Sequence, residues 1–146
     1  MVYFGEHLVR SASTTQGIVS LSYGESEFYA AVKGTSISLG VVALLKDMGV
    51  KLQKPIDLKI DSTACMGIAG RKGAGRVRHI HTPALWIQAA VHEGKVTLGK
   101  EPGTTNPADL GTKPLPKAAI ESIMKRLGFA KVDGKSRIAL KAAVGA

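Results

Sequence analysis

Three acidic residues that lie far apart in the sequence could together act on a phosphodiester. Glu27 lies near the start of a long segment with helical periodicity, Asp61 ends a short alternating segment, and Asp109 lies in the run Asn-Pro-Ala-Asp-Leu. Hard divalent ions take oxygen ligands from clustered carboxylates, and two such ions can stabilise the attacking and leaving oxygens of a phosphodiester. The three residues are therefore candidate ligands for Mg²⁺ or Mn²⁺ and candidate catalytic groups.

Each of these acids also has a purely structural interpretation. Glu27 could complement the dipole of the helix that begins near it. Asp61 could cap a helix that follows the strand, and Asp109 could cap a helix that begins at Asn106-Pro107. The spacing of the residues alone leaves the structural and the functional interpretations open.

The elements that must position these acids can be predicted from hydrophobic periodicity. Apolar residues recur at three or four residues over about 24–48, which predicts a long helix in which Gly34 and Gly40 permit close approach to a sheet. Residues 56–61 alternate between apolar and charged side chains, so Asp61 should leave the buried side at the carboxyl end of a strand. Residues 62–69 can form a short helix.

The rest of the chain supplies further strands and helices. Three segments near the start are rich in β-branched and aromatic residues and predict an antiparallel meander at 2–4, 7–13 and 17–22. Later segments predict a helix at 82–94, a strand at 96–98, a helix start at Asn106, and a helix from about Lys117 to Gly128. This order of elements is typical of a mixed α/β sheet.

Composition limits the possible classes of protein. The chain has 146 residues, enough for one ordinary domain with a buried core. Twenty Lys and Arg against eleven Asp and Glu give a net charge of +9, which favours an anionic partner such as nucleic acid, although solvated lysines could also produce it. Cys65 is the only cysteine, which excludes an internal disulfide and a multi-cysteine zinc site. We therefore expect a reducing, intracellular location, cytoplasmic or nuclear.

No stretch reaches the roughly 20 apolar residues that would span a bilayer, so no membrane partner is expected. The best candidate, residues 37–45, is too short and belongs to the long predicted helix.

Three ordered motifs resemble the ribonuclease H domain of copia-type LTR retrotransposon Pol polyproteins. They are Ser22-Tyr23-Gly24-Glu25-Ser26-Glu27-Phe28, then Asp61-Ser62, then Ala108-Asp109-Leu110-Gly111-Thr112-Lys113. The resemblance covers about residues 2–129 and extends into Pro114-Leu115-Pro116. It implies a ribonuclease H-like mixed sheet flanked by helices, with Glu27, Asp61 and Asp109 as metal ligands and Glu25 as a first-turn or surface acid.

The family has a further Asp on a strand that precedes the helix glutamate, and this sequence begins too late to contain it. The resemblance therefore implies an N-terminally truncated domain at 1–128, with the first strand missing and an incomplete, weakly binding site for Mg²⁺ or Mn²⁺, followed by a basic tail at 129–146. The implied activity is cleavage of RNA in RNA–DNA hybrids during reverse transcription, weak or absent in this fragment. The alternatives are a noncatalytic nucleic-acid-binding module and a structural piece of the polyprotein.

A basic, glycine-rich segment follows the second predicted helix. It matches a family stretch of the form Arg-Thr-Lys-His-Ile-Asp, except that His81 stands in place of the final Asp. Such a segment could follow a nucleic-acid backbone beside the active site, or it could be an ordinary solvated loop. The candidate contacts to an RNA–DNA hybrid are Arg71, Lys72, Arg76, Arg78 and His79. The reverse transcriptase portion of the polyprotein is a further candidate partner.

Overall fold

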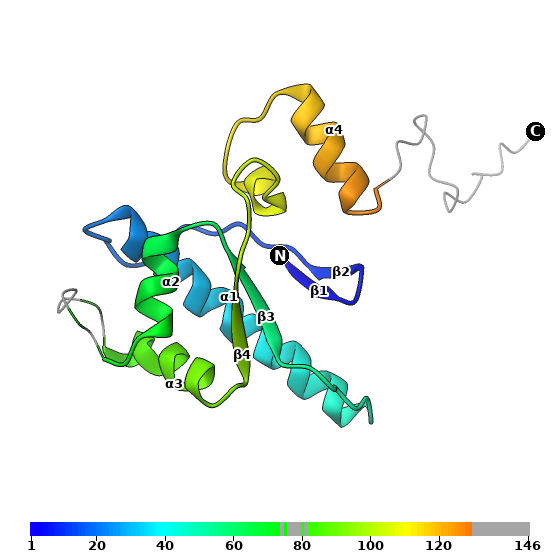
Figure 1. Ribbon diagram of the computed structural model, residues 1–146. Coiled ribbons are helices and arrows are strands. Elements are labelled where there is room, and N and C mark those ends of the chain that lie inside the picture. The colour runs from blue at the N-terminus through cyan, green and yellow to red at the C-terminus, as the bar shows by residue number, and fades with distance from the viewer. Residues whose placement is uncertain (74, 76–79, 81, 130–146) are drawn as a thin grey trace, which may run out of the picture.

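The computed structural model describes residues 1–73, 75, 80 and 82–129, which form a mixed arrangement of helices and short strands (Figure 1). The elements in chain order are β1 Val2–Phe4, β2 His7–Arg10, α1 Tyr23–Asp47, β3 Ile56–Ile60, α2 Thr63–Gly70, the 3₁₀ helix η1 Thr82–Leu85, α3 Trp86–His92, β4 Val96–Lys100, the 3₁₀ helix η2 Pro107–Gly111, and α4 Lys117–Arg126. The predicted α/β class is confirmed. The predicted tail at 129–146 lies outside the described residues, apart from Phe129.

The long helix α1 begins where the sequence predicts, and its start is fixed by two side chains. Ser22 Oγ accepts a hydrogen bond from the Glu25 N–H at 3.2 Å. The Glu25 carboxylate accepts one from the Leu21 N–H at 2.8 Å, and Glu25 is only 2% exposed. This reciprocal arrangement satisfies backbone donors that a helix start leaves free. Glu25 is therefore a buried first-turn acid, and the surface alternative is wrong.

Strands β3 and β4 form a parallel pair whose register runs from Ile56 opposite Val96 to Ile60 opposite Lys100. Ile56, Leu58 and Ile60 are more buried than the exposed Asp57 and Lys59 between them, as the period-two pattern predicts. Because parallel strands end at the same edge, this register brings Lys100 to the point where the chain reaches Asp61.

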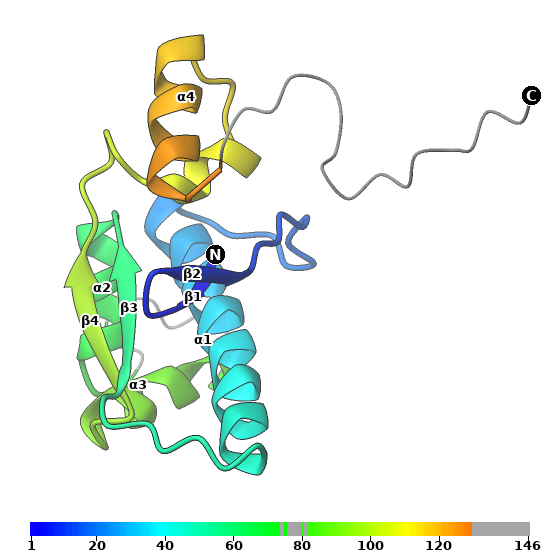
Figure 2. The same ribbon diagram turned by 90° about the vertical axis from the view of Figure 1, so that its right-hand side faces the viewer.

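The predicted three-stranded meander is wrong in its last strand. β1 and β2 pair antiparallel, but residues 17–22 form no strand, since Val19 and Leu21 are 87% and 73% exposed and so bury no face of a sheet. The Leu21 N–H is instead used at the start of α1. Among the described residues the strands form two separate two-stranded sheets, β1–β2 and β3–β4, both in contact with α1 (Figures 1 and 2).

Two of the predicted helices are shorter and tighter than expected. The segment predicted as one helix at 82–94 begins as the 3₁₀ helix η1 and becomes α-helical only at Trp86. The start signal at Asn106 produces the five-residue 3₁₀ helix η2. The last helix, α4, lies beyond the ends toward which β3 and β4 point (Figure 2). Arg126 ties it there, with Nη1 2.9 Å from Glu101 Oε1 and 2.7 Å from the Thr105 carbonyl oxygen.

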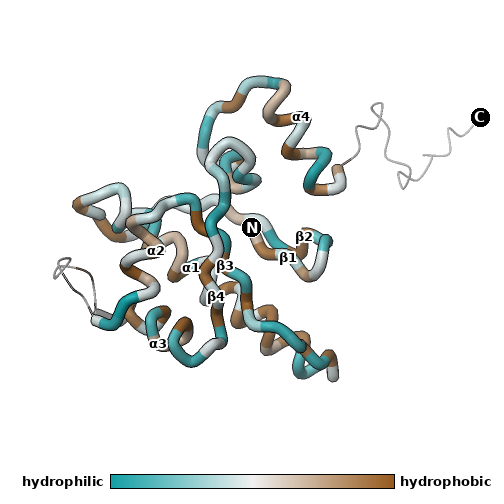
Figure 3. The backbone as a smooth tube through the Cα atoms, viewed as in Figure 1, coloured by the Kyte–Doolittle hydropathy of each residue, from teal (hydrophilic) through white to brown (hydrophobic). Residues whose placement is uncertain are grey.

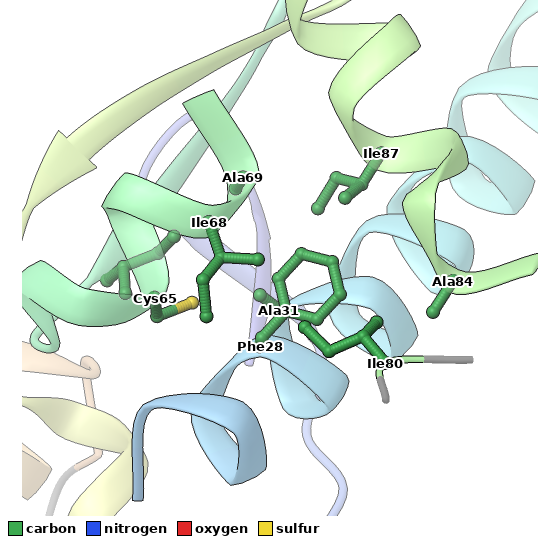
Figure 4. Packing of buried hydrophobic residues seen from close by; sticks show 9 residues of the cluster. Phe28, Ala31, Cys65, Ile68, Ala69, Ile80, Ala84 and Ile87 are labelled. Carbon is green, nitrogen blue, oxygen red and sulfur yellow. The ribbon is translucent and has the colours of Figure 1, made fainter. Parts of the chain in front are cut away.

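The hydrophobic core lies between α1, α2, α3 and the inner face of β3. Phe28 of α1 is fully buried at its centre, and Cys65, Ile68 and Ile87 reach it from α2 and α3 (Figure 4). The other buried members of this cluster are Ala31, Ile60, Ala69, Ile80 and Ala84. The core thus packs against the first half of α1, which is the half that carries Glu27.

Close helix packing depends on a different glycine from those predicted. Within the described residues, no atom lies within 4 Å of the position a Cβ would take at Gly34 or Gly40, so neither permits close approach to the sheet. At Gly24 a Cβ would lie 2.7 Å from the Cβ of Ala64. Gly24 therefore sets the distance between α1 and α2.

Gly24→Ala should destabilise the protein by about 1–3 kcal/mol, because the new methyl group forces α1 and α2 apart. Gly40→Ala, on the same helix but in open space, should stabilise it by about 0.5–1 kcal/mol through helix propensity. Urea denaturation would measure both. Adding Ala64→Gly should restore much of the stability lost in Gly24→Ala; additive losses in the double variant would mean that the two helices do not meet at this point.

The second half of α1 remains apolar although no residue beyond Thr35 is buried there, as the brown segments along the helix illustrate (Figure 3). By length and composition α1 could cross a membrane, which corrects the expectation that no segment is long enough. One such helix is weak evidence, because the core helix of a soluble protein passes the same test. Here α1 contacts α2 and β3, and its buried residues all lie in its first half.

Candidate functional site

The three acids singled out from the sequence lie within electrostatic range of one another. Glu27 projects from the beginning of α1, Asp61 follows β3, and Asp109 lies in η2. The pKa of Glu27 is raised, first by burial and then by the negative charge of Asp61, with a smaller contribution from Asp109. Segments more than 80 residues apart in the sequence are thus brought to one place. We refer to Glu27, Asp61 and Asp109 as the carboxylate set.

Neighbouring residues, not the carboxylate set, cap the helices. Ser62 caps α2, its Oγ accepting from the Cys65 N–H at 3.2 Å, so the interpretation of Asp61 as the cap is wrong. Asn106 caps η2, its side-chain oxygen accepting from the Ala108 N–H at 3.0 Å, so Asp109 is a first-turn acid and not the cap. At α1 the first-turn acid is Glu25, which leaves Glu27 without that role.

Donors from this chain contact each member of the carboxylate set. Lys113 Nζ lies 2.9 Å from Asp109 Oδ1, and the Asn106 amide donates to Asp61 Oδ2 at 3.1 Å. The Tyr23 hydroxyl hydrogen-bonds to Glu27, one helical turn away, and the pKa of Tyr23 is raised chiefly by the charge of Glu27.

Two ammonium groups therefore lie at the edge of the set. Lys100 donates to the backbone carbonyl of Asp61. The pKa of Lys113 is raised, first by its hydrogen bond to Asp109 and further by the charges of Asp109, Tyr23 and Asp61, against a lowering effect of desolvation. Neither lysine was predicted as a site residue. For Lys113 a signal was present in its spacing of four residues from Asp109, whereas the position of Lys100 depends on the register between β3 and β4.

A short segment after β2 forms hydrogen bonds with the elements that carry Glu27 and Asp109. Ser13 Oγ donates to the Gly111 carbonyl oxygen at 2.8 Å, at the end of η2. The Gln16 amide donates to the Ser26 carbonyl oxygen at 2.7 Å, and Lys33 Nζ donates to Thr14 Oγ1 at 2.6 Å. The residues between β2 and α1 therefore connect η2 to the first turns of α1.

The carboxylate set as it stands is not a formed metal centre. Across residues 1–73, 75, 80 and 82–129, no group of three or more His, Cys, Asp or Glu side chains is placed so that it could hold a metal ion. The side chains present do not fit Mg²⁺ or Mn²⁺ without rearrangement, because oxygens of Asp61 and Asp109 are already engaged by Asn106 and Lys113.

Two of the basic residues predicted to bind nucleic acid, Arg71 and Lys72, are not placed beside the carboxylate set. Arg71 and Lys72 follow the last residue of α2, whereas Asp61 precedes its first, so a helix of about 12 Å separates them. Lys72 lines a hollow of about 390 Å³ together with Gln88 and His92. Arg76, Arg78 and His79 lie outside the described residues.

One buried side chain holds the start of this basic segment. The Gln88 amide nitrogen donates to the carbonyl oxygens of Ile68 and Gly73 at 2.8 and 3.1 Å, and its oxygen accepts from the Gly73 N–H at 2.9 Å. Gln88 is 5% exposed and thus ties the loop after α2 to α3.

Comparison with curated proteins gives low-identity relatives over most of the chain. A retrovirus-related Pol polyprotein from transposon RE2 of Arabidopsis thaliana is 26% identical over 133 residues, 90% of this chain and 9% of the relative. The similarity supports an origin in a retrotransposon Pol polyprotein. A second Arabidopsis relative, the Pol polyprotein from transposon RE1, is 25% identical over the same lengths. The chain thus spans about a tenth of these polyproteins. No family model and no solved structure matches the retroelement-derived chain.

Proposed function

We propose that this retroelement-derived chain is a ribonuclease H-like domain that binds RNA–DNA hybrids and cleaves the RNA strand weakly or not at all by itself. The proposed catalytic residues are Glu27, Asp61 and Asp109, and the proposed ion is Mg²⁺ or Mn²⁺, bound weakly. Hybrid contacts are proposed for Arg71, Lys72, Arg76, Arg78 and His79. The relatives are Pol polyproteins, which is consistent with a role beside a reverse transcriptase portion.

One observation carries this proposal. Three carboxylates from α1, the end of β3 and η2 come into electrostatic range of one another, while separate residues cap the three helices. Placing like charges together destabilises a fold, and structural capping does not account for the arrangement. A functional role in binding a cation or a phosphate is the interpretation that fits best.

The separation of the two sheets supports the further proposal that the sheet lacks a strand. β3 pairs with β4 on one edge, and the β1–β2 hairpin contacts α1 without joining that sheet. A strand placed between them would pair with the edge of β3 that is left unpaired by the described residues and would unite the sheets. If it carried an Asp at its end nearest Asp61, it would add the fourth carboxylate that the family resemblance implies.

A second candidate function is a noncatalytic nucleic-acid-binding module. It is favoured by Lys100 and Lys113, whose ammonium groups lie at the carboxylate set, and by the net charge of +9. Phosphate contacts from such groups give affinity that falls with salt and depends little on sequence.

Cleavage of a labelled RNA–DNA hybrid in Mg²⁺ distinguishes these functions. We expect the chain to bind the hybrid and to cleave it slowly or not at all. A version with an added upstream strand bearing Asp should cleave the hybrid faster by at least about a hundredfold. The reason is that carboxylates that hold the ion dominate the stabilisation of charge at the phosphate. Asp61→Asn should abolish cleavage by the extended version.

Asp57→Asn, which removes an exposed charge on β3, the strand that Asp61 follows, is the matched control and should leave cleavage unchanged. Hybrid binding that Asp61→Asn does not alter, with no cleavage by the extended version, would favour the binding module. Failure to bind any hybrid would contradict both functions.

A further inference from the structure

Strand β3 has one edge that the described residues leave unpaired. Within this part of the chain β3 pairs with β4 alone, and the two strands lie side by side (Figure 2). The Ile56 N–H donates to the Lys95 carbonyl oxygen at 3.0 Å, and the Ile60 carbonyl oxygen accepts the last bond of the same ladder. Successive residues of a strand direct their backbone groups to opposite edges. The N–H and carbonyl groups of Asp57 and Lys59 therefore point to the unpaired edge.

The side chains of β3 form a sequence that complements itself when it is reversed. The strand reads Ile-Asp-Leu-Lys-Ile, with Leu58 at its centre. A second β3 strand that ran antiparallel about this centre would place Asp57 opposite Lys59, and Ile56 would lie opposite Ile60. Every residue of the strand would then have a partner.

The charges on this edge select that register. A shift of two residues would place Asp57 opposite Asp57 or Lys59 opposite Lys59, and like charges directly opposite each other are unfavourable in a sheet. A shift of one residue would turn the apolar side chains away from the core face. The symmetric register alone combines full overlap with opposite charges.

The groups that would meet across the edge are accessible. Asp57 Oδ2 lies 2.9 Å from Lys59 Nζ within the strand, and the two side chains are 55% and 52% exposed. Pairing would extend this ion pair into a row of four alternating charges, and the outward backbone groups of both residues would gain partners. Leu58, which is partly buried against the core, would lie against Leu58 of the second copy.

The outer edge of β4 lacks this complementarity. By the same alternation it presents the backbone groups of Val96, Leu98 and Lys100. An antiparallel copy centred on Leu98 would place Lys100 opposite Val96, with no acid to meet the ammonium group. A lysine on a strand edge opposes pairing with another chain.

We propose that the unpaired edge of β3 is an interface with a second copy of this chain, which pairs antiparallel so that Asp57 of each copy faces Lys59 of the other. The contact is isologous, so it closes as a two-fold dimer. The inference does not rest on the proposed function. The added strand considered there would occupy this same edge, so substitution of Asp57 leaves cleavage by the strand-extended version unchanged.

Sedimentation equilibrium of the full chain tests the dimer. We expect a dissociation constant of about 10–100 µM, because a pair of short strands buries less area than a standard interface. Asp57→Lys and Lys59→Asp each place like charges opposite each other and should weaken association at least about tenfold. An equimolar mixture of the two variants restores opposite charges at every position and should associate within about threefold of the unaltered chain.

A second exposed ion pair supplies matched controls. Lys95 Nζ lies 2.6 Å from Glu93 Oε2 between α3 and β4, and the side chains are 64% and 54% exposed. Glu93→Lys and Lys95→Glu change the net charge by the same amounts as the two β3 variants. Neither control should change the dissociation constant by more than about twofold.

Amide hydrogen exchange locates the contact on the backbone. The N–H groups of Asp57 and Lys59 should exchange at least about tenfold more slowly at 300 µM than at 3 µM, because only the dimer pairs them. The Leu58 N–H, which already bonds to β4, should show less dependence on concentration.

The inference would be overturned by a chain that stays monomeric at about 300 µM, by growth beyond a dimer, or by variants that associate as strongly as the unaltered chain. Failure of the mixture to associate, or an equal effect of the controls, would also contradict it. A monomeric chain would leave the proposed function standing, because cleavage of a hybrid by the strand-extended version requires no second copy.

Discussion

Replacing Phe28 by Ala should lower the free energy of unfolding by about 3–5 kcal/mol, a large part of the stability of a domain of this size. Phe28 is fully buried, and its ring is surrounded by residues from α2 and α3 (Figure 4). Alanine would leave a cavity that the aliphatic neighbours cannot fill without moving the helices. Denaturation by urea, followed by far-UV circular dichroism, would measure the loss.

Two further variants keep this prediction testable if Phe28→Ala does not fold. Phe28→Leu retains most of the volume and should lower the free energy of unfolding by only about 1 kcal/mol. Val19→Ala removes an apolar side chain that is 87% exposed and should change it by less than about 0.5 kcal/mol. Equal losses from Phe28→Ala and Val19→Ala would contradict the position of the core.

Loss of Phe28 should also disturb the carboxylate set, since Glu27 precedes it on α1. The helix turn that buries the phenylalanine ring fixes the direction in which the neighbouring carboxylate points. The core and the candidate site are therefore held by the same turn of α1.

Helices and strands with a strong hydrophobic periodicity were predictable from the sequence, and elements fixed by contacts with distant parts of the chain were not. The pattern of α1 and the alternation of β3 place both within a residue or two of their observed bounds. Residues 17–22 have high strand propensity but no partner, and here the start of α1 uses the backbone donor of Leu21. Strand propensity needs a neighbouring strand to take effect, which local sequence does not reveal.

The same distinction applies to the candidate site. The types and order of Glu27, Asp61 and Asp109 were sufficient to group them, and the structure places them within electrostatic range. The sequence did not decide whether Asp61 and Asp109 cap helices. Ser62 lies one residue from Asp61 and Asn106 lies three residues from Asp109, and either of these neighbours could serve as the cap instead. Lys100 was not predicted because its position depends on the register between β3 and β4.

Cys65 should react with iodoacetamide at pH 8 at least about a thousandfold more slowly in the folded protein than in urea. Burial, helped by the charges of Glu27 and Asp61, raises the pKa of the thiol from 9.0 to about 12. The reactive thiolate is therefore about a thousandfold scarcer in the folded state, and full burial restricts access further. Labelling followed by mass spectrometry would measure both rates, and rapid labelling of the folded protein would contradict the prediction.

The same shift in pKa predicts how stability depends on pH. Between pH 9 and 12 the folded chain keeps a proton on Cys65 that the unfolded chain has lost. The stability that is present below pH 9 therefore falls as the pH rises, by about 1.4 kcal/mol per pH unit and about 4 kcal/mol in all. Tyrosine and lysine side chains titrate in the same range, but they are equally present in Cys65→Ala. The difference between the two unfolding curves therefore isolates the thiol.

Cys65 can in turn report on the carboxylate set, because the charges of Glu27 and Asp61 contribute to its raised pKa. Asp61→Asn removes one of these charges and should lower the pKa of the thiol, so that labelling at pH 8 becomes faster and the fall in stability begins at lower pH. Asp57→Asn, an exposed charge on β3, should change neither measurement. If the pKa of the thiol responds equally to both substitutions, or to neither, Asp61 does not lie against the core beside Cys65. The electrostatic grouping of the three carboxylates would then lose its support.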